Sequence, residues 1–324
     1  MTRTSLPILI ATATLASGCF LVPGNDLAEV LPDERISINM PMASDLTKDD
    51  TREWSTFYLW TAEVTEDVNW MTGTVLYWVD TITTQYPPGY VNAEQNEAVW
   101  GPWDDGPLDP TETQLRVHHD LETDGYTWGF EQWPKDAGFE DATAVIDGEV
   151  DPGATRDVST GRFVVDFTSI NTLDPTEGTT GEFAVEYDIG LEGVSGTAMF
   201  TDFGPTHFDA AYRYDQSFGG QGSMDLMLDA DLDPATGTGL DEQLIMHSRW
   251  MPDGSGRADV LVSGGDLGDA VGYATECWSS GFELVYAQEA HTGFEDGDAD
   301  LCAFELPEYP DEDTEEELAN YISY

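Results

Sequence analysis

The feature that most constrains this chain is an alternation of apolar and polar residues with a period of two, which begins after Trp100 and continues through most of the remaining sequence. In one run the apolar residues Phe183, Val185, Tyr187 and Ile189 alternate with Glu182, Glu186 and Asp188. Successive side chains of a β-strand point to opposite faces, so this run predicts a strand with one buried face and one solvated face.

Similar runs cover residues 115–118, 126–133, 143–150, 163–167, 196–203, 210–218, 224–233, 244–250, 258–262 and 273–286. Short segments rich in Gly, Pro and Asp separate them, such as Pro-Asp-Gly-Ser-Gly after Met251, which is typical of a hairpin turn. The sequence therefore predicts about ten to twelve strands in a long antiparallel meander.

Between Arg52 and Tyr86 the period changes to that of a helix. The apolar residues there recur at three-, four- and seven-residue steps: Phe57, Val64, Val68, Met71, Val75, Val79 and Ile82. Thr51 or Asp50 is the expected N-cap, and Pro87 with Pro88 ends the helix. A break near Gly73 is compatible with the same pattern.

These elements predict a mainly β (α+β) fold. A long meander exposes its edges and one apolar face unless it curls or is covered. We expect residues 51–304 to form one domain, in which the N-terminal helix packs against a curved or barrel-like antiparallel sheet. A two-sheet sandwich would produce the same alternation and is the alternative.

The N-terminal residues have the features of a targeting signal. Arg3 precedes an apolar segment, Leu6 to Ala16, which is too short to span a bilayer. Ala16, Ser17 and Gly18 then lead into Cys19, and this arrangement resembles a bacterial lipoprotein signal covering residues 1–18. The resemblance implies lipid attachment, such as palmitate, at Cys19, and a cell-envelope location, with the outer membrane expected. An ordinary secretory signal cut near Ser17 is the alternative.

The segments that flank the predicted domain differ from it in composition. Residues 19–50 contain helix-breaking Pro and Gly and are expected to act as a tether from the membrane. Residues 305–324 are rich in acids and contain no Lys or Arg, so we expect a flexible acidic tail.

The charge balance excludes one class of partner. The chain has 64 Asp and Glu residues against 11 Lys and Arg, for a formal net charge of −53. Nucleic acid would be repelled, so no nucleic-acid partner is expected. A dense carboxylate surface is tolerated at about 1 M salt, where the Debye length is about 3 Å, so we expect a halophilic habitat. Binding of divalent cations is an alternative explanation for the acids.

Cys277 and Cys302 are the two cysteines that remain beside Cys19, and an oxidising compartment favours a disulfide between them. Closing a loop of about 25 residues stabilises a fold by roughly 3 kcal/mol in the chain-entropy model. Two buried free thiols are the alternative. A zinc site is disfavoured because neither cysteine has a suitably spaced partner ligand.

The search for catalytic motifs leads to no enzyme class. The five histidines lack metal-ligand spacing, and neither a nucleophile elbow nor a phosphate-binding loop is present, so we expect a non-enzymatic protein without an obligatory cofactor. Two acidic clusters, Asp229, Asp231 and Asp233, and Asp296, Asp298 and Asp300, are candidate Ca²⁺ ligands. Solvated turn residues are the alternative.

Two tryptophans, Trp100 and Trp103, are candidate ligand-binding residues, because indole rings can form a stacking platform or the mouth of an apolar cavity. Trp128 and Trp133 can belong to the same group. Packing in the core is the alternative interpretation of these side chains.

Several segments together resemble a family. They are LPDERISINMP (31–41), VNWMTGTVLYWVDTITTQYPP (68–88), AVWGPW (98–103), DPTETQLRV (109–117), GRFVVDF (161–167) and TECWSSGFELVY (275–286), followed by Cys302. They are similar to predicted lipoproteins of myxobacteria and related bacteria, a family without an established activity. The resemblance implies an envelope location and leaves the function open.

Two functions agree with these expectations. A helix against a concave sheet can enclose an apolar cavity, so one hypothesis is a lipid-anchored carrier of a lipid or other hydrophobic ligand. The other is a surface interaction or structural lipoprotein that binds cations, polysaccharide or protein. The sequence does not predict an oligomeric state.

Overall fold

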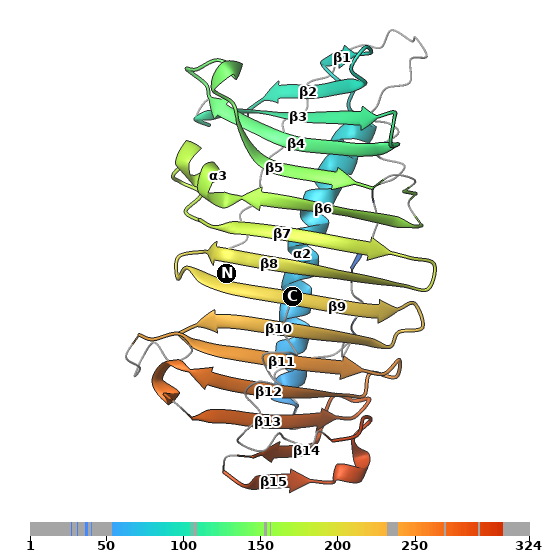
Figure 1. The fold of residues 1–324 in the computed structure, drawn as a ribbon, viewed down its shortest axis with the longest axis vertical. Helices are drawn as coiled ribbons and strands as arrows, with labels where there is room; N and C mark the ends of the chain where they lie inside the picture. Colours follow the sequence, from blue (N-terminus) through green and yellow to red (C-terminus); the bar gives the residue numbers. More distant parts are fainter. Residues whose placement is uncertain are drawn as a thin grey trace. The chain divides into compact units, whose positions relative to one another are not determined.

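The computed structural model describes residues 27, 31, 36, 37, 40, 54–104, 106, 109–151, 154, 155, 157–231, 239–268, 270–290 and 292–306. Within them one long helix, α2 (Thr56–Gln85), precedes fifteen strands whose order in an antiparallel sheet follows their order in the sequence (Figure 1). None of the helices in these ranges is long and apolar enough to cross a membrane. The predicted fold class, a mainly β meander with a packed N-terminal helix, is confirmed.

The described chain divides into two compact units, one with residues 27, 31, 36, 37 and 65–218 and the other with residues 40, 54–64 and 219–306. The strands of the first unit are β1 (Tyr90–Asn92), β2 (Glu97–Trp103), β3 (Thr111–Asp120), β4 (Gly125–Pro134), β5 (Thr143–Val150), β6 (Ser159–Asp166), β7 (Glu182–Ile189), β8 (Gly193–Phe203) and β9 (Phe208–Ser217). A 3-10 turn, η2 (Phe139–Asp141), follows β4, and a short helix, α3 (Phe167–Leu173), follows β6.

The second unit contains β10 (Gly222–Ala230), β11 (Glu242–Trp250), β12 (Gly256–Gly264), β13 (Val271–Trp278), β14 (Leu284–Glu289) and β15 (Phe294–Gly297). Two 3-10 turns, η3 (Gly265–Leu267) and η4 (Ala299–Leu301), complete it.

The sheet is open, which corrects the barrel-like alternative, and the described strands do not form a sandwich. β1 and β15 are its edge strands. An open sheet tolerates such edges when they are short and charged. β1 has three residues, while β15 has four exposed residues that include Glu295 and Asp296.

The described strands differ from the prediction in several places. They number fifteen where about ten to twelve were expected, and β10 ends at Ala230 although the pattern continues to residue 233. Two further differences have a local cause. Residues 273–286 form parts of two strands, β13 and β14, because a tight turn in which Phe282 N donates to Ser279 O (2.8 Å) separates them. Phe167, expected at the end of a strand, begins α3, because the Asp166 carboxylate accepts from Ser169 N (2.8 Å) and caps the helix.

The N-terminus of α2 is capped by a neighbouring side chain and by a strand. Ser55 Oγ accepts from Tyr58 N (3.1 Å), and Glu276 Oε2 on β13 accepts from Ser55 Oγ (2.7 Å) and from Phe57 N (3.0 Å). A carboxylate at this position satisfies free N–H groups and opposes the positive end of the helix dipole. The caps predicted from sequence, Thr51 and Asp50, lie outside the described residues.

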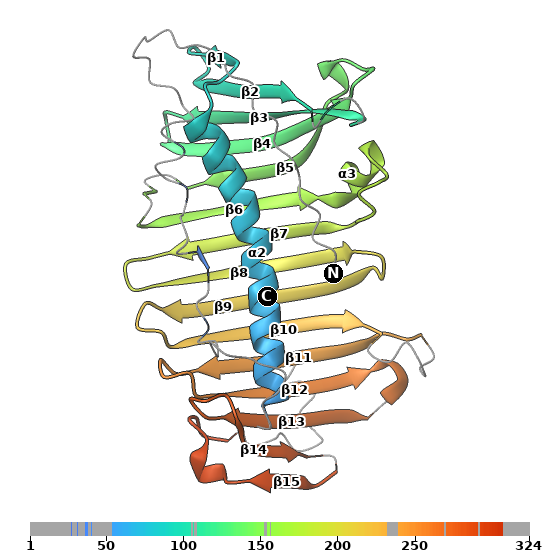
Figure 2. The ribbon, with the colours of Figure 1, turned by 180° about the vertical axis from the view of Figure 1, so that it is seen from behind.

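The helix is continuous through Gly73 and packs on one face of the strands in each unit (Figure 2). In the first unit Val75, Leu76 and Val79 are buried, and Thr65 Oγ1 is bonded to Tyr212 Oη (3.1 Å). In the second unit Thr61 Oγ1 donates to Ser248 Oγ (2.9 Å). These polar contacts fix the position of the helix across the strands, in addition to apolar burial.

Large rings lie over glycines of the neighbouring strand on this buried face. A Cβ atom added at Gly148 would overlap the Trp128 ring, one added at Gly222 would overlap Trp250, and one added at Gly256 would overlap Trp278. Because glycine has no side chain, each indole can lie flat on the sheet beneath the helix. The core is therefore built from ring and glycine pairs as well as from aliphatic contacts.

Candidate functional site

The face of the first unit opposite α2 carries two rows of side chains that cross five strands. Tyr212 on β9 contacts the helix, so its row of cross-strand neighbours marks the helix side of the sheet. This row runs through Ala198, Val185, Phe163 and Gly148 to Trp128. The alternating positions face the other way. They form one row of Arg116, Gly129, Asp147, Val164 and Ala184, and another of His118, Thr127, Glu149, Arg162 and Glu186.

These two rows line a depression of about 420 Å³, which we call the sheet groove. Its lining also includes Glu131, Trp128, Gly148, Phe163 and Val185. Its floor at β4 requires glycine, because a Cβ atom at Gly129 would lie 2.7 Å from Ile146 O. The groove crosses β3 to β7, and neighbouring strands are about 4.8 Å apart, so it extends about 19 Å across the sheet.

Ion pairs hold both arginines of the groove in place. Arg116 Nη1 lies 2.8 Å from Glu97 Oε2, and Arg116 Nη2 lies 3.3 Å from Glu131 Oε2, which also accepts from Gln114 Nε2 (2.5 Å). Burial lowers the pKa of the Arg116 guanidinium, but its bonds to Glu97 and Glu131 outweigh that effect and raise the pKa overall. Arg162 Nε lies 2.8 Å from Glu149 Oε1 on the more exposed part of the face.

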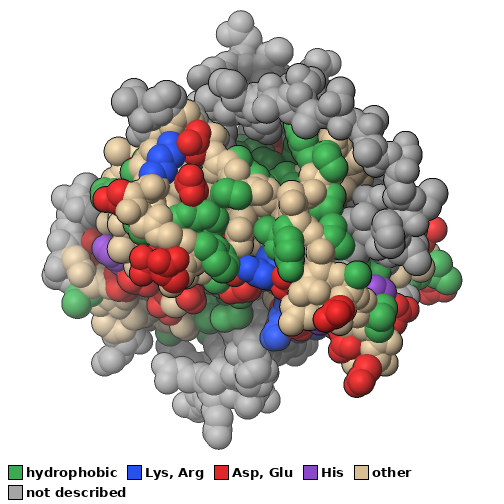
Figure 3. All heavy atoms as spheres, turned by 90° about the horizontal axis from the view of Figure 1, so that it is seen from above, with side chains coloured by type: hydrophobic (Ala, Val, Ile, Leu, Met, Phe, Trp, Pro, Cys, Tyr) green, Lys and Arg blue, Asp and Glu red, His purple; other side chains and the backbone are tan. Residues whose placement is uncertain are grey.

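The groove has more carboxylates than guanidiniums. Glu131, Asp147, Glu149 and Glu186 line it beside the two arginines. On the face seen in Figure 3, Asp and Glu side chains also outnumber Lys and Arg. This balance disfavours an anionic ligand and leaves many donors and acceptors for a neutral polar one.

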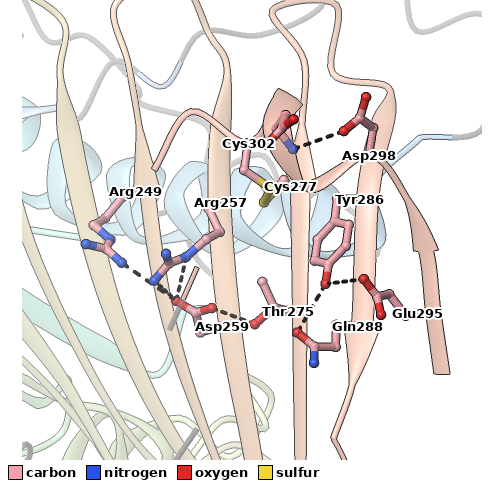
Figure 4. The surroundings of a disulfide bond; sticks show 11 residues. Arg249, Arg257, Asp259, Thr275, Cys277, Tyr286, Gln288, Glu295, Asp298 and Cys302 are labelled. Carbon is pink, nitrogen blue, oxygen red and sulfur yellow. Dashed lines mark hydrogen bonds and ion pairs between the residues drawn. A yellow bond between two sulfur atoms is a disulfide. The ribbon is translucent and has the colours of Figure 1, made fainter. Parts of the chain in front are cut away.

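The corresponding face of the second unit is covered by the chain itself. The disulfide predicted between Cys277 and Cys302 is present, with a Cα–Cα distance of 5.4 Å, and Cys277 is fully buried (Figure 4). The Arg249 guanidinium lies over the Phe304 ring, 5.3 Å from its centroid. The segment after β15 therefore packs on this face instead of leaving it open.

Under that segment lies a charged cluster. Arg257, with 3% of its surface exposed, donates to Asp259 Oδ2 from Nε (2.9 Å) and from Nη2 (2.6 Å). Asp259 Oδ1 accepts from Thr275 Oγ1 (2.7 Å), and His247 Nδ1 is paired with Asp225 on β10. Arg257, Asp259 and Thr275 bond to one another across β12 and β13, whereas the His247 and Asp225 side chains are 43% and 46% exposed. The buried part of the cluster therefore stabilises the unit and is a weaker candidate site than the groove.

Among the acidic residues predicted as Ca²⁺ ligands, those that the structure describes make separate hydrogen bonds. Asp229 accepts from Gln243 Nε2 (3.3 Å) across the strand pair, Asp296 accepts from Gly297 N (3.0 Å), and Asp298 accepts from Asp300 N (3.1 Å). Asp231 follows the end of β10, and Asp233 lies outside the described residues. Within the described ranges, no group of three or more His, Cys, Asp or Glu side chains could hold a metal ion. Calcium binding stays a prediction.

The predicted ligand-binding tryptophans occupy different environments. Trp100 has 1% of its surface exposed, and its Nε1 donates to Tyr86 O (2.9 Å) just after α2. Trp103, at the end of β2, is partly exposed. Trp133 is buried, so core packing explains Trp100 and Trp133. Trp128 is also buried, with 4% of its surface exposed, but it borders the groove described above.

Sequence reasoning singled out one residue that lines the groove, Trp128, and missed the others. Alternation indicates that Arg116, His118 and Arg162 face away from the core, and the adjacent His119 does point to the other face, where it stacks on Tyr126. Choosing the groove residues among all outward polar positions requires the pairing register of five strands, which alternation does not provide. The lipidation residue Cys19 lies outside the described residues.

We compared the chain with known proteins, and no family model, curated protein or solved structure matches it.

Proposed function

We propose that this protein is a non-catalytic, lipid-anchored protein of the bacterial cell envelope that binds polysaccharide in the sheet groove. The observation that carries the proposal is the groove, of about 420 Å³, across β3 to β7, which no described segment covers. The proposal combines this site with the anchor expected from the sequence.

The dimensions of the groove favour an extended ligand. It runs about 19 Å across five strands, and both lateral rows are continuous from β3 to β7. Small-molecule sites bury most of their ligand in a deep cleft. A shallow site of this length instead suits a polymer that contacts successive side chains.

The chemistry of the groove favours hydroxyl groups. Its arginines are paired with Glu97, Glu131 and Glu149, so their charge is compensated within the protein. Carboxylates accept and guanidiniums donate hydrogen bonds, and a sugar hydroxyl can do both. Val164 and Ala184, at the β6 and β7 end of one row, offer a less polar surface to a sugar ring.

The carrier hypothesis is less well supported. A carrier requires an apolar cavity between the helix and the sheet, and large side chains occupy that position in the first unit. Leu76, Phe163 and Tyr212 there each have 3% or less of their surface exposed. The core of the unit therefore favours a ligand on the open face.

The anchor is proposed from the sequence alone. Residues 1–18 would be removed as a signal, and Cys19 would carry the lipid and hold the protein at the outer membrane, on its periplasmic or surface side. Replacing Cys19 with Ser should release the protein into the soluble fraction, and a variant that stays membrane-bound would contradict the anchor without affecting the groove.

Binding can be tested with a matched pair of arginine variants. Arg162 lines the groove, whereas Arg213 is an exposed arginine on β9 outside it. Using immobilised envelope polysaccharide and soluble oligosaccharides, we expect Arg162→Ala to weaken binding about tenfold, because it removes charge-assisted hydrogen bonds. Arg213→Ala should bind as the unaltered chain does. Equal affinity for all three proteins would contradict the proposed site.

A further inference from the structure

The solvent side of α2 in the first unit carries large aromatic side chains. The exposed fractions are 69% for Trp70, 63% for Tyr77 and 37% for Trp78. Residues seven and eight positions apart lie on the same side of a helix, opposite the buried Val75 and Val79. Exposed aromatic groups of this size are typical of interaction sites, because leaving them in water is unfavourable.

Two carboxylates extend this surface. Glu66 and Asp67 are exposed and lie four and three residues before Trp70, so they are its neighbours on the helix surface. Partial burial of the Asp67 carboxyl, together with the charge of Glu66, raises its pKa. We call Glu66, Asp67, Trp70, Tyr77 and Trp78 the helix stripe.

The helix stripe has no cation of its own. The sequence of α2 from Thr56 to Gln85 contains no Lys or Arg. Aromatic faces attract cations through their quadrupoles, and carboxylates pair with cations, so both parts of the stripe favour a positively charged group. No Lys or Arg on α2 supplies that group.

We propose that the helix stripe docks a cationic, arginine-rich segment of another protein. Guanidinium groups can stack on Trp70 and Tyr77 and pair with Glu66 and Asp67, which combines cation–π contacts with ion pairs. Tryptophan and tyrosine are also the side chains that most often dominate protein interfaces. The stripe and the sheet groove lie on different sides of the unit, so the two proposals are independent.

Charge disfavours the other occupants of this surface. A second copy of the chain would bring two acidic stripes and two net charges of −53 together. An anionic lipid surface would be repelled for the same reason. An arginine-rich segment is the partner whose charge complements the stripe.

The test measures the affinity of the full chain for a synthetic arginine-rich peptide by calorimetry at fixed ionic strength. Trp70→Ala combined with Tyr77→Ala should weaken binding about tenfold, although it leaves the net charge unchanged. Glu66→Gln combined with Asp67→Asn should weaken it to a similar degree. Circular dichroism confirms that each variant is folded.

Two control variants separate docking from diffuse attraction. Leu191→Ala with Phe218→Ala removes exposed apolar groups elsewhere in the unit, and Glu182→Gln with Asp188→Asn removes the same charge from strand β7. Both controls should bind the peptide as the unaltered chain does. If stripe and control variants bind equally, attraction is diffuse and the proposal is wrong. Binding to phosphatidylcholine vesicles without binding to the peptide would identify a lipid surface instead and would also overturn it.

Discussion

At the scale of single residues, the most demanding group is the Arg257 guanidinium. It is buried on β12 under the segment that follows β15, and its main partner is Asp259, whose side chain is 20% exposed. A buried charge is tolerated only with a close partner and further hydrogen bonds. Thr275 supplies one by donating to the other carboxylate oxygen.

Asp259→Ala should therefore lower the free energy of unfolding by about 3 kcal/mol, because it leaves a buried cation without its partner. The matched control is Glu149→Ala, which breaks the exposed pair with Arg162 and should cost less than about 1 kcal/mol. Urea denaturation of both variants measures the difference. Equal losses would show that Arg257 is not held by Asp259.

At the scale of elements, the effect of adding a methyl group at a glycine depends on what lies beside that glycine. A Cβ atom added at Gly73 in the helix would have no other atom within 4 Å, while the space beside Gly148 on β5 is filled by the Trp128 ring. The helix therefore has room for a side chain at Gly73, whereas β5 has none at Gly148.

Gly73→Ala should stabilise the protein by up to about 1 kcal/mol, because alanine favours the helix and meets no obstacle. Gly148→Ala should destabilise it by about 2 kcal/mol, since the added methyl group displaces a packed indole. Thermal unfolding of the two single variants tests both signs. A stable Gly148→Ala protein would mean that the ring is not packed against this strand.

Three buried tyrosines, one on β7 and two on β9, make the first unit sensitive to alkaline pH. Burial raises the pKa of Tyr187, Tyr212 and Tyr214 far above the ordinary value of 10.0. Below pH 10 these tyrosines are neutral in both the folded and the unfolded chain, and the folded state keeps its full stability. Above pH 10 only the unfolded chain ionises at these residues, so the free energy of unfolding falls as pH rises.

At about pH 11 each of these tyrosines should lower the free energy of unfolding by about 1.4 kcal/mol relative to pH 9. Tyr212→Phe should reduce this pH-dependent loss by about a third while costing about 1 kcal/mol for its bond to Thr65. Urea denaturation at the two pH values gives both quantities. The same pH slope in the variant and the unaltered chain would contradict the assignment.

Most of these elements can be predicted from sequence, because their patterns are local. Alternation locates the strands from Glu182–Ile189 to Glu242–Trp250, and the three- and four-residue steps locate α2. The cap by Glu276, the glycine and indole pairs and the groove each join residues distant in sequence, so they depend on register and packing. The open sheet was also beyond prediction, because alternation is the same in barrels, sandwiches and open sheets.

At the scale of the whole molecule, the net charge of −53 sets the dependence on salt. Raising NaCl from about 0.1 M to about 1 M shortens the Debye length from about 10 Å to about 3 Å and weakens repulsion between carboxylates. The melting temperature should therefore rise with NaCl. A constant or falling value would contradict the halophilic expectation.

Calcium can be separated from this general effect by comparing millimolar CaCl₂ with NaCl of equal ionic strength. Specific binding to the folded state would raise the melting temperature further with CaCl₂. The same value in both salts would dismiss a Ca²⁺ site at Asp229 and Asp231 or at Asp296, Asp298 and Asp300.

The central claim is that the sheet groove of the first unit binds polysaccharide, and amide hydrogen exchange with and without envelope polysaccharide tests it most directly. We predict that bound polysaccharide slows exchange in β3 to β7, where the groove lies, and leaves β10 to β15 unchanged. Slower exchange confined to α2 or to the second unit, or no change at saturating polysaccharide, would contradict it.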